Sequence, residues 1–210
     1  MHFASVLLTL LTMVVIGGAV GNISLPTVEQ ITSSSTGYLY QAFVKYQDVK
    51  DVFLFAPSDN FIYAPKLNAA FHVTKNTLFK VTFQGGFYNW RQSRLDQYVQ
   101  IMVNDYLIFY NRLIPNTNQR VTLLSGVSNR QTDAMGGYYY DATNADTMVP
   151  LTRVAMVYLP PGLYTFNVGV RSVFGSGRLI GGTVTYELTQ IDNNNNKEDL
   201  GDFKLTKLPL

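Results

Sequence analysis

The chain has 210 residues, of which 47% are hydrophobic, 13% aromatic and 14% charged, and it contains no cysteine. The charged fraction is below the roughly 25% usual for globular domains, and the formal charge of +2 forms no basic block, which argues against nucleic-acid binding. The lack of cysteine excludes disulfides, thiolate metal ligands and a cysteine nucleophile. Abundant tyrosine, phenylalanine, valine and threonine favour β-sheet.

The N-terminal segment predicts export from the cell. An apolar run extends from Val6 to Ile16, and Ala19-Val20-Gly21 gives the small-x-small pattern at which signal peptides are cleaved. We therefore interpret residues 1–21 as a signal peptide and expect a secreted, extracellular protein with no membrane span after cleavage. The alternative is a retained membrane anchor, because about 18 apolar residues are borderline for crossing a bilayer of ~30 Å.

A polar stretch follows the predicted cleavage point. Residues 22–36 include Ser33-Ser34-Ser35 and are interpreted as an extended leader outside the folded domain. Asn22-Ile23-Ser24 is an N-x-Ser/Thr sequon, which makes Asn22 a candidate glycosylation site on a secreted chain. The domain itself is expected over residues 37–190.

Short segments of β-type pattern follow one another through this domain, separated by Gly, Pro, Asn or Asp. The clearest alternating or apolar runs are, in chain order, Val52–Phe55, Phe71 with Val73, Phe79 with Val81 and Phe83, Val99 with Ile101 and Val103, Leu107–Phe109, Val121–Leu124, Val154 with Met156 and Tyr158, and Val184 with Tyr186 and Leu188. Because the chain shows no convincing 3.6-residue period, this pattern predicts an all-β fold. The fold class that we predict is an antiparallel β-sandwich of jelly-roll type.

The stretch Leu159–Arg171 combines a chain reversal with a half-buried strand. Pro160 and Pro161 cannot donate to a strand ladder and Gly162 tolerates positive φ, so the triplet should end one strand and turn the chain. Beyond it, alternate residues share a face. The predicted core face holds Tyr164, Phe166, Val168 and Val170, and the opposite face holds Thr165, Asn167, Gly169 and Arg171.

Two segments lack the strand pattern. Residues Ser125–Thr147 form a long connection of low hydrophobicity, and such connections are usually functional or mobile. Residues 191–210 begin with Asp192 and four asparagines and are interpreted as a polar C-terminal tail. The tail has two interpretations, a disordered extension or a segment that docks Phe203, Leu205 and Leu208 onto the domain or a neighbour.

Four segments, 71–83, 99–105, 148–164 and 181–188, resemble in pattern the jelly roll of the complement globular-head and tumour-necrosis-factor superfamily. They also resemble the C-terminal domains of bacterial collagen-like surface proteins. No Gly-X-Y stalk precedes the domain, although many of these relatives have one. The resemblance implies a non-enzymatic extracellular module that forms a homotrimer and binds a protein or glycan partner or builds an extracellular layer.

Aromatic side chains in two connections are the first candidate binding site. Tyr88 and Trp90 fall in one connection, and Tyr138, Tyr139 and Tyr140 fall in another. Sugar rings or a protein partner could stack on such side chains, which combine a large apolar area with a polar tip. The alternative is that these tyrosines are core residues or contacts between subunits.

Oxygen ligands in the long connection are the second candidate. Asp133, Asp141, Asn144 and Asp146 offer carboxylates and an amide of the kind that calcium accepts, although their spacing matches no EF-hand. Their alternative role is that of solvated loop residues. No other cofactor is expected.

Catalytic signatures are weak. His72 is the one histidine beyond the predicted signal peptide, and it lies within a predicted strand. Gly175-Ser176-Gly177 is a turn rather than a nucleophile elbow, and no phosphate-binding loop is present. A hydrolase that uses the loop acids ranks lowest, and we expect a non-enzymatic, self-associating binding protein. The alternative function is that of a carbohydrate-binding module that uses the loop aromatics.

Overall fold

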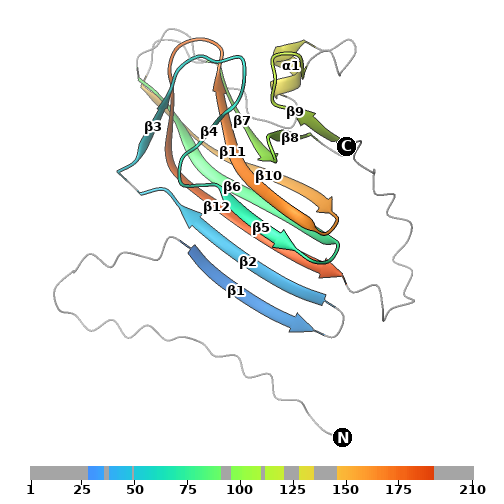
Figure 1. Ribbon diagram of the computed structural model, residues 1–210. Coiled ribbons are helices and arrows are strands. Elements are labelled where there is room, and N and C mark those ends of the chain that lie inside the picture. The colour runs from blue at the N-terminus through green and yellow to red at the C-terminus, as the bar shows by residue number, and fades with distance from the viewer. Residues whose placement is uncertain are drawn as a thin grey trace, which may run out of the picture.

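The computed structural model describes residues 28–35, 38–48, 50–90, 96–109, 112–120, 128–134 and 146–191. Within them, twelve strands form two antiparallel sheets of six strands each, with one short helix (Figure 1). Sheet A runs β1 (Val28–Ser35), β2 (Tyr38–Tyr46), β12 (Gly177–Ile191), β6 (Thr77–Asn89) and β10 (Thr147–Leu159), and β3 (Val52–Phe55) pairs with β12. Sheet B runs β4 (Ile62–Tyr63), β11 (Gly162–Ser172), β7 (Gln97–Val103), β8 (Tyr106–Phe109) and β9 (Arg112–Pro115), and β5 (Ala69–Val73) pairs with β11. The helix is α1 (Asn129–Ala134).

The pairing order is that of a jelly roll. When β1, β3, β4 and β9 are left aside, the other strands are β2, β12, β6 and β10, which are neighbours in sheet A, and β5, β11, β7 and β8, which are neighbours in sheet B. The first strand of this set therefore pairs with the last, and the second pairs with the last but one, as in a double Greek key. The prediction of an antiparallel β-sandwich of jelly-roll type is confirmed.

The turns lie where the sequence predicts them. β10 ends at Leu159 and β11 begins at Gly162, so Pro160 and Pro161 reverse the chain between the two sheets. Asn104 and Asp105 have φ of 48° and 66°, which closes the β7–β8 hairpin in the left-handed region that Asn and Asp tolerate. Gly162 is not among the described glycines with positive φ, which are Gly175 and Gly181.

The main core fills the space between the sheets. Its largest members are aromatic, and Phe79 and Phe166 approach with ring centroids 4.8 Å apart. Tyr186 is fully buried here and donates its hydroxyl hydrogen bond to the Leu67 carbonyl. Burial raises the pKa of Tyr186 above its ordinary value. The other fully buried apolar residues of this cluster include Leu67, Phe83, Phe87, Val99, Ile101, Val168, Val170, Leu179 and Val184.

A second apolar cluster covers the opposite face of sheet B. It consists of Phe61, Tyr98, Met102, Leu107, Phe109 and Ile114, all buried. Strand β11 therefore has no solvated face along its second half, since Asn167 and Arg171 are each 6% exposed. The expectation of one core face in this strand was wrong, because a layer formed by other segments covers the face that carries polar residues.

Two boundaries differ from the expected ones. Residues 28–35, assigned by composition to a polar leader, pair with β2 over eight positions from Val28–Lys45 to Ser35–Tyr38. Sheet A thus begins before the predicted domain start at residue 37, because backbone pairing requires no apolar side chains. The long connection Ser125–Thr147 contains the short helix α1, whose six residues are too few to show a helical period.

The predicted signal peptide, Asn22, the strand Val121–Leu124 and most of the C-terminal tail lie outside the described residues. Among the described residues, none belongs to a helix that is long and apolar enough to cross a bilayer.

Candidate functional site

The outer face of sheet A is the open face of the sandwich. From Met148 to Met156, every second residue of β10 is exposed, and these side chains point away from the core. β10 is also an edge strand, since β6 is its one strand partner within the described residues. Long edge strands with exposed apolar side chains are sites at which chains associate.

Strand register gathers apolar side chains at one end of this face. Arg178 in β12 lies opposite Leu54 in β3, and Tyr88 in β6 lies opposite Met148 in β10. Because Leu179 pairs with Phe87, the adjoining residues Arg178 and Tyr88 are neighbours too, and the four form one row across the sheet. Leu54 is 59% exposed and Met148 is 58% exposed. We refer to Leu54, Tyr88, Trp90, Met148 and Arg178 as the Arg178 site.

Two aromatic rings hold the cation of this site. The Arg178 guanidinium carbon lies 4.7 Å from the Trp90 ring centroid and 5.9 Å from the Tyr88 ring centroid. Trp90 is 54% exposed, so much of its indole remains accessible. Within the described part of the chain, the Arg178 guanidinium has these ring contacts and no ion pair.

The chemistry of the Arg178 site suits a ligand with an anionic group on an apolar body. A guanidinium presents N–H donors in a planar fork that matches a carboxylate. Its ring contacts fix the orientation of that fork, while the exposed indole offers a surface for stacking. Tyr88 and Trp90, predicted from sequence as binding aromatics, thus lie together, whereas Tyr138, Tyr139 and Tyr140 lie outside the described residues.

The middle of the same face is polar. Glu187 in β12 accepts a hydrogen bond of 3.0 Å from the Tyr40 hydroxyl and forms an ion pair of 2.7 Å with Lys80. The hydrogen bond from Lys80 is the main cause that lowers the pKa of Glu187. Burial and the Glu187 carboxylate raise the pKa of Tyr40.

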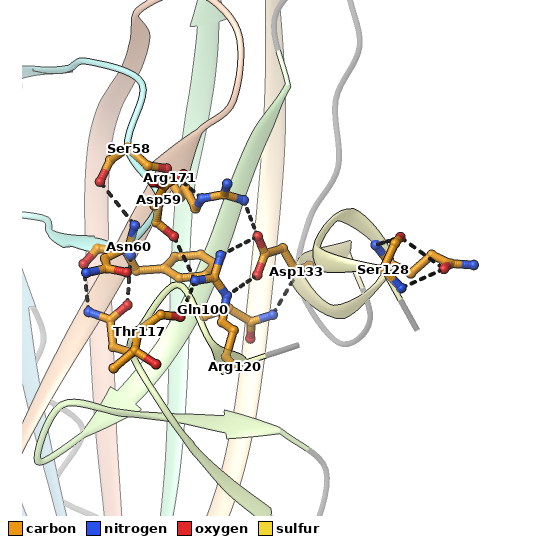
Figure 2. A network of polar contacts seen from close by, with 12 residues as sticks. Ser58, Asp59, Asn60, Gln100, Thr117, Arg120, Ser128, Asp133 and Arg171 are labelled. Atoms are coloured by element: carbon orange, nitrogen blue, oxygen red, sulfur yellow. Dashed lines mark hydrogen bonds and ion pairs between the residues drawn. The ribbon is translucent and has the colours of Figure 1, made fainter. Parts of the chain in front are cut away.

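A buried ionic cluster lies on the other side of the molecule, against the outer face of sheet B (Figure 2). Asp133, on α1, accepts two hydrogen bonds from Arg120, at 2.7 Å from Nε and 2.8 Å from Nη2. It also forms an ion pair with Arg171 of β11. Asp133 and Arg120 are each 1% exposed.

Carbonyl oxygens complete the coordination of this cluster. Arg120 Nη1 donates to the Asp59 and Thr117 carbonyls at 2.7 Å each, and Arg171 Nε donates to the Ser58 carbonyl at 2.6 Å. The cluster therefore joins α1, the segment before β4, the segment after β9 and β11. It fixes the layer that covers sheet B.

The predicted calcium ligands are only partly described. Both carboxylate oxygens of Asp133 are engaged by guanidinium groups, so this residue serves an ionic cluster in the protein interior rather than a solvated loop. Asp146 is exposed at the start of β10, and Asp141 and Asn144 lie outside the described residues. Among the residues that the structure describes, no three His, Cys, Asp or Glu side chains come close enough to hold a metal ion. The calcium site stays a prediction.

His72 is the fourth of the five residues of β5, which confirms its predicted place in a strand, and it is exposed. Sequence reasoning missed three arginines. Arg178 lies ninety positions after Tyr88 and follows a Gly-rich turn, so only strand register shows that the two are neighbours. The sequence pattern placed Arg171 on the polar face of its strand. It gave no sign that Arg171 has a buried acidic partner. Arg120 lies just before residues 121–127, which are outside the described part.

Comparisons with known proteins give no family. No family model matches the chain, and a search of curated proteins finds no match. Among solved structures, a chain in the structure of infectious bursal disease virus Gx strain aligns over 74% of this chain and 34% of its own length, with 10% identity and a TM-score of 0.30. This chain thus spans about a third of that viral chain.

Proposed function

We propose that this chain is a secreted, non-enzymatic recognition or matrix protein that self-associates through edge strand β10. The observation that carries the proposal is the exposed apolar character of that strand. Val154 is 42% exposed and Met156 is 53% exposed, and both lie on the outer face of sheet A beside a strand edge that has no strand partner in the described part of the chain. Exposed apolar side chains on a long edge strand favour contact with another chain over contact with water.

The Arg178 site and the self-association surface are separate. Met148 and Val154 lie six residues apart on β10, which at about 3.3 Å per residue places them roughly 20 Å apart. The resemblance to the complement globular-head and tumour-necrosis-factor superfamily supports a homotrimer. It also supports an extracellular location, as does the apolar N-terminal segment with its small-residue cleavage pattern.

The mass of the purified secreted protein in solution tests this proposal. Light scattering at micromolar concentration is expected to give three times the mass of one chain. Val154→Asp combined with Met156→Asp places two charges at the contact, and we expect it to shift the protein to a monomer. Val52→Asp is the matched control, because Val52 is exposed on the same face but on β3. A monomeric wild-type protein would contradict the proposal.

A second candidate function is the binding of carbohydrates that carry carboxylates. The exposed indole of Trp90 beside the Arg178 cation is the observation that favours it. A glycan array is expected to give signals for uronic acid or sialic acid sugars and none for their neutral counterparts. Trp90→Ala and Arg178→Ala should each abolish those signals, while Tyr106→Ala, at an exposed tyrosine of sheet B, should preserve them. Binding that survives both Trp90→Ala and Arg178→Ala excludes this function.

A further inference from the structure

A groove opens along one side of the sandwich, between the two sheets. Its volume is about 360 Å³. The groove exists because sheet A continues beyond β12 with β2 and β1, whereas sheet B continues beyond β11 only with the short strands β4 and β5, of which β5 borders the groove (Figure 1). The inner face of β2 therefore has no full strand opposite it within the described residues, and Phe43 is only half-buried.

The residues that line the groove are arranged as in a site that binds an additional β-strand. All five consecutive residues of β5, Ala69–Val73, line it, whereas β12 contributes only alternate residues, namely Tyr186, Leu188 and Gln190. Alternate residues share one face of a strand. A groove is lined by consecutive residues only where it runs along the edge of the strand. One wall is therefore the backbone edge of β5, and the floor is the inner face of β2 and β12.

The floor combines apolar and polar side chains, since Phe43, Tyr186 and Leu188 share it with Gln41, Lys45 and Gln190. Phe71 at the edge of β5 lies 5.2 Å from Phe43 and 5.3 Å from Tyr186, measured between ring centroids. Within the described residues, β5 pairs with β11 alone, so its second edge has no strand partner. An exposed strand edge beside a floor that carries aromatic rings is an arrangement that binds an added strand, with backbone hydrogen bonds along the edge and alternate side chains on the floor.

The chain itself supplies a segment of the required pattern. Phe203 and Leu205 alternate with Lys204 and Thr206, and Pro209 follows at a position where a strand would end. In an extended conformation, Phe203 and Leu205 would share one face and the two polar side chains the other. This pattern fits a strand that has one apolar side on the groove floor and one polar side in water.

The path of the chain brings this segment to the groove. Gln190 lines the groove and the last residue of β12, Ile191, pairs with Tyr38, so the chain leaves sheet A at the end of the groove. Gln190 pairs with Thr77, which follows β5 by only a turn, so this is the Val73 end of the groove. A segment that returns along the groove from there runs antiparallel to β5.

The spacer is long enough. Residues 192–202 connect β12 to Phe203, and an extended chain of that length spans up to roughly 36 Å at about 3.3 Å per residue. The five residues of β5 span about 17 Å. We propose that residues 203–206 of this chain occupy the groove as an added strand of sheet B, antiparallel to β5 along the edge that has no strand partner within the described residues.

Engineered cysteine pairs in the full chain test this proposal, because the chain has no cysteine of its own. Ala70 is exposed on β5 and faces away from the groove floor, so its neighbours in an added strand would be Lys204 and Thr206. We expect Ala70→Cys with Lys204→Cys or with Thr206→Cys to form an intrachain disulfide on mild oxidation, detected by mass. Val52→Cys with Thr206→Cys is the matched control and should form none, since β3 lies at the opposite end of β12.

Hydrogen exchange supplies the second measurement. Phe203→Asp with Leu205→Asp should speed amide exchange in Ala69–Val73 by about tenfold or more, because the strand partner is lost. Lys204→Asp with Thr206→Asp changes charge on the solvent side and should leave exchange there unaltered. A disulfide between two chains would overturn the proposal in favour of a second copy as the occupant. The lack of any disulfide, with unchanged exchange in β5, would overturn it outright.

Discussion

The outer faces of the two sheets carry ionic groups in opposite settings. On the outer face of sheet B, Asp133 of α1 is 1% exposed and lies between Arg120 and Arg171. On sheet A, Glu187 and Lys80 form an ion pair whose side chains are 24% and 43% exposed. Ion pairs thus stabilise a buried contact between segments on the sheet B face and belong to the solvent-exposed surface on the sheet A face.

This difference explains which face is free to bind. A buried charge must be fully partnered, so the sheet B cluster is fixed by hydrogen bonds to the carbonyls of Ser58, Asp59 and Thr117, which come from two segments. The sheet A face has no such layer over the described parts of β10, and its apolar side chains remain in contact with solvent. The sheet B face therefore serves packing, and the recognition function that we propose would use the sheet A face.

The largest effect is expected from Asp133→Asn. The substitution removes the negative charge that compensates two buried guanidinium groups, and breaking such a pair on one side typically costs about 3–5 kcal/mol. We expect the free energy of unfolding, measured by urea titration, to fall by that amount. Asp59→Asn is the control, because the exposed Asp59 contributes its backbone carbonyl to Arg120, and that carbonyl is kept. Equal losses in the two variants would show that the cluster has no special role.

A pair of glycine substitutions gives the next largest effect. In Gly169→Ala, the new Cβ would clash with the Met102 sulfur and lie 3.0 Å from the Phe61 Cβ, within the layer over sheet B. Overpacking of this kind costs about 1–3 kcal/mol. Gly86→Ala, on the outer face of sheet A, meets its nearest atom, the Met148 Cγ, at an ordinary 3.6 Å. Thermal unfolding should therefore show a loss for Gly169→Ala and almost none for Gly86→Ala, and the reverse order would mean that the faces are wrongly assigned.

The sequence was sufficient to predict those parts of the architecture that depend on local strand patterns. Alternation in β6 places Phe79, Val81 and Phe83 on one face, and the structure buries all three. The Pro160-Pro161 reversal and the Asn104-Asp105 hairpin turn depend on the backbone preferences of those residues alone, so they too were predictable.

Alternation does not show what lies over the second face of a strand. Gln100, Asn167 and Arg171 have the polar character of solvated positions, yet all three are buried. Gln100 donates a hydrogen bond to the Asp133 carbonyl and Arg171 pairs with the Asp133 carboxylate, and local pattern carries no information about partners so distant in sequence. The same limit applies to the Arg178 site, where the aromatics were predictable and the cation between them was not.

Tyr186→Phe should have a smaller effect that depends on alkaline pH. Burial raises the pKa of Tyr186 above that of an unfolded tyrosine, which is about 10. A group with a raised folded-state pKa contributes stability that is fully present below the unfolded-state pKa and is lost as pH rises toward the folded-state value. The wild-type protein should therefore lose stability above about pH 10 more steeply than Tyr186→Phe. At neutral pH the variant should lose about 1 kcal/mol, the typical net value of one hydrogen bond. If the free energy of unfolding showed the same pH dependence in both proteins, the Tyr186 hydroxyl could not be buried in its un-ionised form.

The smallest effect is expected from Glu187→Gln on the open face. Lys80 holds the pKa of Glu187 below its usual value near 4.5, so the contribution of this pair is present above that pH and lost as pH falls through the folded-state pKa. Solvent screens the pair, and the loss at neutral pH should be far below that of Asp133→Asn. Urea titrations from pH 6 down to about pH 3 should show a shallower acid dependence of the free energy of unfolding in the variant than in the wild type.

Salt gives a second comparison of the two ionic clusters. Because salt weakens exposed pairs, 1 M salt should reduce this difference while leaving the Asp133→Asn loss nearly unchanged. An Asp133→Asn loss that fell equally in high salt would show that water reaches both clusters, and the contrast between the two faces would then fail.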